Sequence, residues 1–329
     1  MTDGAPVLAV EDLVVALHRG DREDPVLDRV SITLGAGECL AVVGESGAGK
    51  TVLALAVIGL LPPGMRIAGG SIRVAGTEVV GAPEAVVRGL RGRAVGMVFQ
   101  DPQASLHPAF RVGAQVAEAI RAHRPEVGRS GARAEAAARL RAVGIGDPRA
   151  FPHQLSGGMR QRVMIAMATA NDPPCVIADE ATSALDVGVQ AQVLDVLSRA
   201  RIGTGAGLML VTHDLGVAAT AADRIAVLYA GRLVEVGPTA AVLGDPQHPY
   251  TQGLAAAVPR LDRLAPVVPI PGQPPAVGDR PSGCAFRTRC GRAEDRCATE
   301  VPHLEPCGHP VPGGAGDARV ACHRPGRAG

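Results

Sequence analysis

Residues 44–51 read GESGAGKT and contain Lys50, the only lysine of the 329-residue chain. Lysine and arginine together number 33, so the other 32 basic residues are arginines. Three closely spaced glycines let a backbone curl so that several N–H groups face one anion, and a helix starting there adds its positive end. A compact ammonium fits a narrow phosphate cradle better than the wide arginine fork. This chemistry predicts binding of a nucleotide's phosphates.

The loop matches the pattern G-x-x-x-x-G-K-[ST] at every fixed position. The apolar run at 39–43 predicts a buried parallel strand before it, and residues 51–61 predict a helix after it. This context argues against a chance glycine-rich turn. We expect Thr51 to offer its hydroxyl to Mg²⁺. The expected nucleotide-binding residues of the loop are Gly44, Glu45, Ser46, Gly47, Ala48, Gly49, Lys50 and Thr51.

A pair of acids follows a second predicted strand. Residues 175–178 form an apolar run after two prolines, and Asp179 and Glu180 come at its carboxyl end, the edge where open α/β sheets bind ligands. Asp179 is expected to hold Mg²⁺, and Glu180 to act as general base on the attacking water. Two acids that simply cap a strand end are the alternative, which the phosphate loop makes less attractive.

The stretch LSGGMRQRVMIAMATA at 155–170 predicts a second anion site. Ser156 is a good helix N-cap, and Ser156, Gly157 and Gly158 place backbone N–H groups at the start of a helix. One nucleotide does not need two such cradles from one chain, so a head-to-tail dimer is the simple geometric solution. An ordinary capped helix is the alternative for this stretch taken alone.

Together these motifs resemble the ATP-binding cassette (ABC) family over about residues 7–260, with LSGGMRQR matching the family signature. The resemblance implies that Gln100 is the Q-loop glutamine, which senses Mg²⁺ and water. It implies that 183–186, ending at Asp186, is the D-loop that crosses to the other subunit. It also implies that His213 touches the γ-phosphate and positions Glu180. The family usually stacks adenine on an aromatic residue, where this chain has Leu17 and His18.

The fold class expected from the motifs and the resemblance is α/β, a P-loop NTPase with a RecA-like parallel sheet core. A small antiparallel β subdomain, an inserted helical subdomain and a short cysteine-containing C-terminal extension complete it. We expect a nucleotide-binding domain at 1–258, with the helical subdomain at about 101–160. Helical spacing of apolar residues at 112–124 and 133–145 supports that insertion. The C-terminal extension is residues 259–329.

Three further segments resemble the oligopeptide and dipeptide importer ATPases, a subgroup that includes nickel importers: FQDPQASLHPAF, DPQHPYTQGL and PIPGQPP. The resemblance implies an ATPase, using ATP and Mg²⁺, that drives solute uptake through two separate membrane permease subunits. An extracytoplasmic solute-binding protein acts through that permease. The chain would pair with a sister ATPase or a second copy of itself, peripherally on the cytoplasmic face of the membrane. The sequence names neither the solute nor which pairing holds.

Five of the seven cysteines lie in the last 46 residues. Members of this subgroup often carry cysteines that match Cys284, Cys290, Cys297 and Cys322, and the resemblance implies a candidate 4Fe–4S cluster on them. Cys307 is extra to that pattern. Zinc is one alternative, because His303, His309 and His323 are nearby, although the cysteine spacings are wider than usual for zinc. A tail of free thiols is the other alternative.

Charge and hydropathy exclude several other classes. The formal net charge is +1, so no general basic face for nucleic acid is expected. No charged-then-apolar leader opens the sequence, and the apolar run at 52–63 is shorter than the roughly 20 residues of a membrane span. A soluble cassette ATPase acting on DNA or ribosomes remains an alternative, but it usually has two cassettes or long coiled coils. An exporter ATPase is a third, disfavoured by the peptide-type segments.

Overall fold

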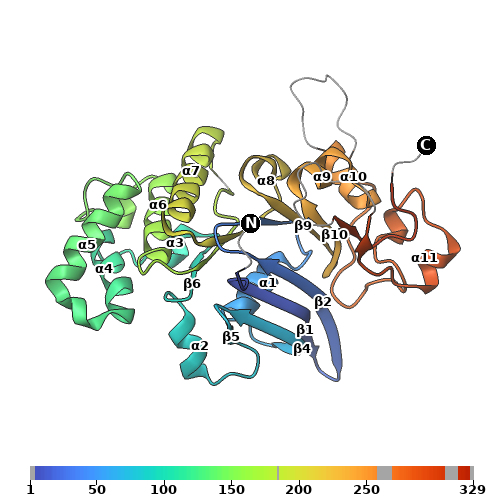
Figure 1. Ribbon diagram of the computed structural model, residues 1–329, viewed down its shortest axis with the longest axis horizontal. Coiled ribbons are helices and arrows are strands. Elements are labelled where there is room, and N and C mark those ends of the chain that lie inside the picture. Colours follow the sequence, from blue (N-terminus) through green and yellow to red (C-terminus); the bar gives the residue numbers. More distant parts are fainter. Residues whose placement is uncertain (1–3, 184, 258–268, 308–317, 327–329) are drawn as a thin grey trace. The chain divides into compact units, whose positions relative to one another are not determined.

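The computed structural model describes residues 4–183, 185–257, 269–307 and 318–326, and its ribbon is drawn in Figure 1. The chain forms two compact units, each assembled from three stretches of sequence. The first contains Met1–Leu8, Thr33–Glu38 and Arg73–Leu210, and the second Ala9–Ile32, Cys39–Ile72 and Val211–Gly329. The expected domain boundary after residue 258 and Ala184 of the D-loop lie outside the described residues.

The first unit holds most of the helices that were expected as an insertion. Its elements are β5 (Thr77–Glu78), α2 (Glu84–Leu90), β6 (Val95–Val98), α3 (Pro102–Ser105), α4 (Val112–His123), η1 (Pro125–Val127), α5 (Gly128–Ala142), η2 (Pro152–Gln154), α6 (Gly157–Ala168), β7 (Cys175–Asp179), α7 (Val187–Thr204) and most of β8 (Gly207–Thr212). Strands β6 and β7 pair in parallel, with Val95 opposite Cys175. This pair is the arrangement expected of a RecA-like core.

Helices α4 and α5 pack through regularly spaced apolar residues, and they lie side by side in Figure 1. On α4, Val112, Val116 and Ile120 are fully buried at intervals of four. On α5, Ala132, Ala136 and Leu140 repeat the same interval and are also fully buried. A stripe of this spacing lies on one face of a helix. Helix α5 starts five residues before the apolar pattern predicted at 133, and it ends at Ala142.

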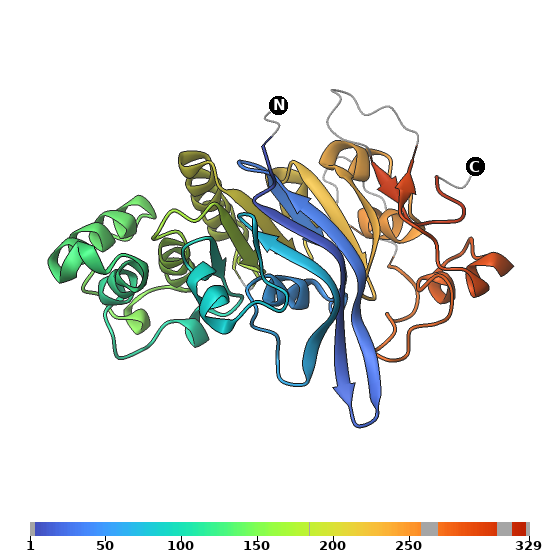
Figure 2. The same ribbon diagram turned by 60° about the horizontal axis from the view of Figure 1, so that its bottom comes forward.

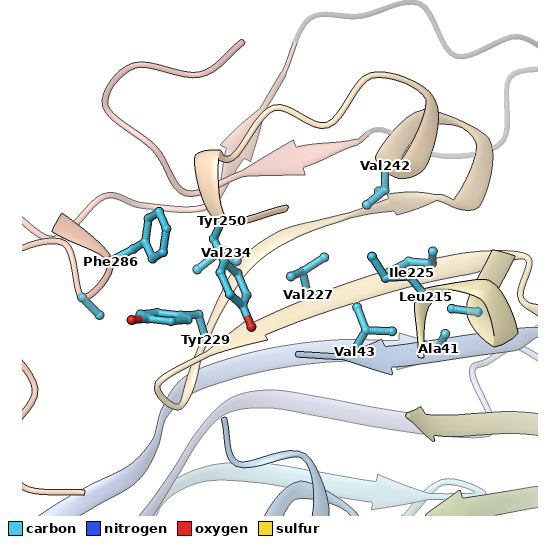
Figure 3. Packing of buried hydrophobic residues seen from close by; sticks show 12 residues of the cluster. Ala41, Val43, Leu215, Ile225, Val227, Tyr229, Val234, Val242, Tyr250 and Phe286 are labelled. Carbon is cyan, nitrogen blue, oxygen red and sulfur yellow. The ribbon is translucent and has the colours of Figure 1, made fainter. Parts of the chain in front are cut away.

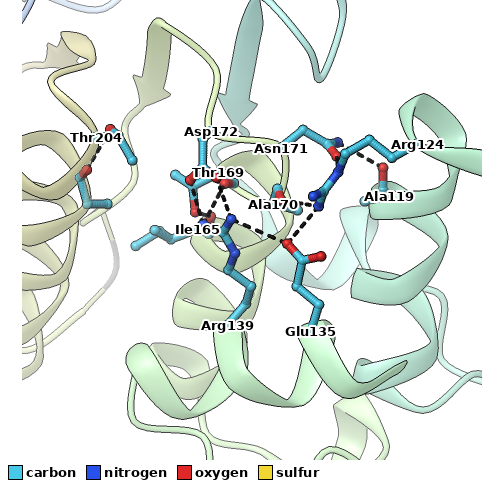
Figure 4. Close-up of polar contacts among 11 residues, drawn as sticks. Ala119, Arg124, Glu135, Arg139, Ile165, Thr169, Ala170, Asn171, Asp172 and Thr204 are labelled. Atoms are coloured by element: carbon cyan, nitrogen blue, oxygen red, sulfur yellow. Dashed lines mark hydrogen bonds and ion pairs between the residues drawn. The ribbon is translucent and has the colours of Figure 1, made fainter. Parts of the chain in front are cut away.

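Arginines tie these helices to the turn that follows α6 (Figure 4). Arg124 at the end of α4 donates to Glu135 of α5 at 2.6 Å and to Asn171 at 3.1 Å. Arg139 of α5 donates to both carboxylate oxygens of Asp172, at 2.6 and 2.5 Å. These Arg139 hydrogen bonds hold the pKa of the Asp172 carboxyl below its usual value. The network remains partly exposed, since the Asp172 side chain is 48 % accessible.

The second unit combines a parallel core with the C-terminal residues. Its elements are β1 (Leu8–Arg19), β2 (Arg22–Leu34), β3 (Cys39–Val43), α1 (Lys50–Val57), most of β4 (Met65–Val74), α8 (Leu215–Ala221), β9 (Arg224–Tyr229), β10 (Arg232–Pro238), α9 (Thr239–Gly244), α10 (Pro249–Ala256), η3 (Arg287–Arg289), α11 (Asp295–Thr299), β11 (Glu305–Pro306) and β12 (Arg319–Val320).

The sheet of this unit runs in the order β11-β12-β10-β9-β3. Strand β3 pairs in parallel with β9, as expected of the core, whereas β9–β10, β10–β12 and β11–β12 are antiparallel. All five residues of β3 are buried, as an apolar run in a parallel sheet covered on both faces should be. The pairing of β12 with β10 brings the end of the C-terminal extension into the sheet, which the sequence did not predict. The parallel pairs with their covering helices confirm the α/β fold class.

A long hairpin of β1 and β2 dominates the N-terminal part (Figure 2, blue). Two residues, Gly20 and Asp21, separate the strands, and so short a connection makes them antiparallel. Strand β4 lies next to β1 in the same sheet. This is the small β subdomain expected from the sequence.

Aromatic residues fill one end of the second unit's core (Figure 3). Tyr229 at the end of β9 and Tyr250 of α10 are the chain's only two tyrosines, and both are buried. Their ring centroids lie 4.6 Å apart. Phe286 from the C-terminal extension meets Tyr229 edge-on at 5.2 Å and Tyr250 at 5.4 Å. With aromatics only 2 % of the chain, this cluster concentrates large apolar area at one place.

Candidate functional site

The phosphate loop joins β3 to α1, as the sequence predicts. Lys50 begins α1 and is only 5 % exposed. Its ammonium donates hydrogen bonds to the carbonyls of Gly44, at 2.8 Å, and of Glu45, at 3.1 Å. The side chain therefore curls back over the loop that it closes.

At two positions of the loop, a side chain would clash with neighbouring atoms and the backbone has a positive φ, so both positions need glycine. Gly49 caps α1 with φ 101°, and a Cβ atom there would lie 2.7 Å from the Leu27 side chain. Gly44 has φ 153°, and its Cβ would overlap the backbone carbonyl of Leu228. Any other residue at these positions must displace β2 or β9. The loop is therefore fitted closely to its own unit.

The acid pair stands at the end of β7 in the first unit. Asp179 is the last residue of the strand and is 2 % exposed. Glu180 follows with φ 45°, in the left-handed region that a non-glycine residue rarely adopts. Backbone strain of this kind persists where surrounding structure over-determines it, which is frequent at active sites. Ser183 supports the turn by donating its hydroxyl to the Glu180 carbonyl at 2.8 Å.

The structure brings Gln100 and Glu180 together. Gln100 follows β6, and its side-chain Nε2 donates to Glu180 Oε2 at 3.1 Å. Because β6 and β7 are neighbouring parallel strands, their carboxyl ends meet at one edge of the sheet. The two residues are 80 positions apart in the sequence. A glutamine amide that donates to one oxygen of a carboxylate can fix the orientation of that carboxylate.

The LSGG stretch begins α6 as expected. Ser156 is the N-cap and accepts a hydrogen bond from the Met159 N–H at 3.3 Å. Gly158 faces α7 so closely that a Cβ atom there would overlap the Val189 side chain. Asp186 caps α7 by accepting from the Val189 N–H at 2.9 Å. Ser156, Gly158 and Asp186 thus belong to one packed corner, where two helix N-termini lie together.

His213 follows β8, as the sequence predicts, and belongs to the second unit with Lys50 and Thr51. Asp214, next in sequence, caps α8 by accepting from the Gly216 N–H at 2.7 Å. Leu17 and His18, at the expected adenine position, lie near the end of β1. His18 is exposed, and its ring nitrogen stands 3.8 Å from Glu23. Its imidazole is the planar group available at this end of the hairpin.

Two residues that hold the phosphate loop were missed by sequence reasoning. The Tyr250 hydroxyl accepts a hydrogen bond from the Glu45 N–H at 2.7 Å, and the Arg289 guanidinium donates to both Glu45 carboxylate oxygens, at 2.6 and 3.0 Å. Burial raises the pKa of the Tyr250 phenol, so it stays protonated at neutral pH. The rarity of tyrosine could have pointed to Tyr250. It is one of only two tyrosines in the chain, and it lies in the segment DPQHPYTQGL.

The four cysteines expected to match line one small cavity. Cys284, Cys290, Cys297 and Cys322 surround it together with arginines and two histidines. Burial raises the pKa of the Cys322 thiol to about 11 and also raises that of Cys284, so a metal ion would have to displace the protons of both thiols. Within the described residues, no three His, Cys, Asp or Glu side chains converge as a metal site. The expected 4Fe–4S cluster is therefore not supported by this arrangement, and His309 of the zinc alternative lies outside the described residues.

Among the described residues, no helix combines the length and apolar character that crossing a bilayer requires.

Comparison with known proteins agrees with these features. Residues 27–183 match the ABC transporter family, and residues 234–297 match the oligopeptide/dipeptide transporter C-terminal region. The oligopeptide transport ATP-binding protein OppD of Mycobacterium tuberculosis is 47 % identical over 97 % of this chain and 52 % of its own length. The dipeptide transport ATP-binding protein DppD of Bacillus subtilis is 43 % identical over 86 % of each chain. The chain thus spans about half the length of the mycobacterial relative.

Solved structures lead to the same fold. A dimeric bacterial ABC transporter cassette, MJ0796, covers 70 % of this chain with a TM-score of 0.64 and 26 % identity. The cbiO1 protein of Clostridium perfringens, part of an ABC transporter complex, covers 73 % with a TM-score of 0.64 and 25 % identity. With its phosphate loop, its signature helix and its peptide-transporter C-terminal region, the chain belongs to the ABC transporter family of ATP-binding proteins.

Proposed function

We propose that this chain is the ATP-hydrolysing subunit of an importer that takes up peptides or a related small solute through separate membrane permeases. The observation that carries the proposal is a contact. Arg289, within the matched peptide-transporter region, holds Glu45 of the phosphate loop at 2.6 Å. The two matched regions therefore act on one loop. Relatives described as peptide import and dipeptide transport ATP-binding proteins support the direction and the class of solute.

In the proposed cycle, the loop N–H groups and Lys50 hold the β- and γ-phosphates. Thr51 and Asp179 would hold Mg²⁺, which would supply positive charge beside the phosphates. Glu180 takes the proton of the attacking water, with its carboxylate oriented by Gln100. His213 positions Glu180 and contacts the γ-phosphate. These roles account for the buried lysine, the strained glutamate and the hydrogen bond on it.

A second copy or a sister ATPase completes each site in this proposal. Ser156, Gly157 and Gly158 of one subunit face the γ-phosphate held by the other, with Asp186 at the crossing. The dimeric cassette among the similar solved structures supports a paired arrangement. ATP closes the dimer and hydrolysis reopens it. The protein would then act peripherally, on the cytoplasmic face of the membrane.

Two exposed aromatic residues, one before Gln100 and one ten residues after it in the sequence, would supply a surface for the permease. Phe99 and Phe110 are 38 % and 56 % exposed, and both lie in the first unit. Burying a phenylalanine stabilises an interface by about 1.5–3 kcal/mol. Ile202 of α7 is more exposed, at 72 %, in the same unit, and it provides a matched control outside the Q-loop region.

The test is a mild-detergent pull-down of the tagged full chain from its own membranes, with partners identified by mass spectrometry. Two multi-span permeases are expected, and recovery of a second ATPase would identify a heterodimer. Phe110→Ser should reduce permease recovery several-fold, and Ile202→Ser should not. Ribosomal proteins or DNA in place of permeases would contradict the proposal and favour the soluble class of cassette ATPases.

A further inference from the structure

Arg289 connects the C-terminal extension to a phosphate-loop residue 244 positions earlier in the sequence. Its two terminal nitrogens donate in parallel to Glu45, at 2.6 and 3.0 Å. The Arg289 side chain is 3 % exposed and that of Glu45 is 28 % exposed. Such a two-point pair fixes direction as well as distance, which a single-point lysine contact does not.

Arg289 is itself rigidly placed. Its Nε donates to the Pro271 carbonyl at 2.7 Å, and Nη1 lies 3.4 Å from the Tyr229 hydroxyl. The guanidinium carbon stands 5.7 Å from the Tyr229 ring centre and 5.8 Å from that of Phe286, within the range of cation–π attraction. These contacts of the C-terminal extension and Tyr229 therefore hold the Arg289 guanidinium in one orientation.

Glu45 is restrained at three chemical groups. Arg289 binds its carboxylate, Tyr250 accepts from its N–H, and Lys50 donates to its carbonyl. Lys50 is the residue expected to contact the phosphates. A displacement of Glu45 would therefore move the lysine's own hydrogen-bond acceptor. Arg289 thus reaches the phosphate-binding ammonium through a single intervening residue.

Charge gives the contact a second consequence. Glu45 places a carboxylate in a loop that must receive the multiply negative phosphates of ATP. Two like charges near a protein surface repel each other appreciably, because the effective dielectric constant there is well below that of water. Arg289 neutralises the carboxylate and directs it toward the extension. Without the arginine, an uncompensated, partly buried anion would remain in the loop.

We propose that Arg289 is a positioning residue through which the C-terminal extension sets the affinity of the phosphate loop for ATP. The inference rests on the ATP-binding role of the loop and does not depend on which solute is transported. It gives the extension a task at the nucleotide site, separate from any metal. Arg289 touches neither the reacting phosphate nor the water, so its effect should be on binding.

The experiment measures the Kd for MgATP by calorimetry, and KM and kcat for ATP hydrolysis, on the purified full chain. Arg289→Met should raise Kd and KM about tenfold and leave kcat within twofold. Arg289→Lys, which keeps the charge without the two-point geometry, should fall between Met and the wild type. Arg287→Met is the matched control, because Arg287 lies in the same short helix but bonds to Ser282. That control should leave Kd within twofold.

The double variant Glu45→Gln/Arg289→Met separates positioning from general structural damage. If Arg289 acts through the Glu45 carboxylate, the double variant should bind MgATP within twofold of the weaker single variant, whereas an arginine with a merely structural role would give losses that multiply. An unchanged Kd in Arg289→Met, or a double variant whose Kd rises by the product of the two single effects, would overturn the proposal. Both readouts use the isolated chain, so a failure of the transport proposal would leave them unaffected. If Arg289→Met does not fold, the same comparison of single and double variants is made with Arg289→Lys.

Discussion

The phosphate loop and the acid pair are held in different ways, although both belong to ATP chemistry. Around the loop, Lys50 is 5 % exposed and Glu45 is restrained by three partners, one of them the buried Tyr250. At the acid pair, Glu180 sits in a strained backbone conformation and receives a hydrogen bond from an exposed glutamine. Groups with several buried partners are fixed in advance, whereas an exposed hydrogen bond exchanges readily with water.

This difference suggests a division of labour. The loop is shaped for phosphate before any nucleotide arrives, so its contribution should appear in affinity. The exposed hydrogen bond between Gln100 and Glu180 can be rearranged at low cost, so the contribution of this contact should appear in turnover and in coupling to a partner. Variants of the two regions should therefore change either the Kd for MgATP or kcat. The burial of a contact should decide how much free energy of unfolding is lost with it.

The largest expected effect is on turnover. Glu180→Gln keeps the size of the side chain but removes its basicity, so kcat should fall about 10²–10⁴-fold. The Kd for MgATP should stay within twofold, because Lys50 and the loop are untouched. Steady-state ATPase assays and calorimetry on one preparation measure both. A variant that retained more than a tenth of wild-type kcat would remove Glu180 from the role of general base.

The next effect is on affinity. Lys50→Arg preserves the charge but places a planar fork where the ammonium now bonds to two carbonyls, at 2.8 and 3.1 Å. We expect the Kd for MgATP to rise about 10- to 100-fold, the loss of one to two charge-assisted hydrogen bonds. An unchanged Kd in this variant would mean that the loop accepts an arginine as readily as its lysine. The loop would then be less rigid than we infer from its buried contacts.

Acid should destabilise the end of the second unit through His248. Burial, assisted by the positive charge of Arg292, lowers the pKa of this histidine to about 3. Below pH 6.5, the ordinary pKa of histidine, His248 binds a proton in the unfolded chain but not in the folded chain. The free energy of unfolding therefore falls as the pH drops from 6.5 toward 3. At pH 5 this one histidine should lower the free energy of unfolding by about 2 kcal/mol.

His248→Asn provides the comparison for that pH effect. An asparagine can still cap α10, where the His248 ring nitrogen now accepts from the Tyr250 N–H at 3.0 Å. Urea unfolding between pH 5 and 7.5 should show a shallower slope for the variant than for the wild type. Parallel slopes would show that His248 is not held neutral in the folded protein.

A smaller loss is expected from Tyr250→Phe. The ring remains in the aromatic cluster, but the Glu45 N–H loses its acceptor at 2.7 Å. An unsatisfied buried donor costs about 1–3 kcal/mol, which denaturant unfolding should detect together with a weaker ATP affinity. Full stability and full affinity would indicate that water replaces the hydroxyl, and that the loop is less enclosed than its burial suggests.

The smallest effect should come from the first unit's surface network. Asp172→Asn removes the charge that meets Arg139 at 2.5 Å, but the Asp172 side chain is 48 % exposed. We expect less than about 1 kcal/mol of destabilisation, the usual scale for such pairs. A loss of 2 kcal/mol or more would show that exposure is a poor guide to the cost of breaking arginine–carboxylate contacts in this protein.

Local patterns predicted the elements that have local causes. The run at 39–43 became β3, GESGAGKT became the loop into α1, and Ser156 capped α6. In each case adjacent residues carry the signal: an apolar run, glycines at fixed spacing, or a capping hydroxyl. The helical insertion was also foreseen, although α5 begins at Gly128, earlier than its apolar pattern, because exposed residues that carry no apolar signal form its first turn.

Contacts between distant residues could not be predicted in the same way. Arg289 is one of 32 arginines, and nothing adjacent to it points to a glutamate 244 positions away. No sequence pattern predicts the pairing of Val320 with Glu235 at the sheet edge either. The resemblance implied a metal cluster because four cysteines match the subgroup in type and order. Such a match does not report whether the thiols converge in space, and within the described residues they form no metal site.

The most direct test of the whole account is peptide transport by the reconstituted complex. The chain, its co-purified permeases and the binding protein would be placed in vesicles and supplied with ATP on the side that carries the chain. We expect ATP-dependent accumulation of a labelled short peptide on that same side, and loss of this accumulation in Glu180→Gln. Peptide movement in the opposite direction, or ATP turnover with no peptide movement for any peptide length, would contradict it.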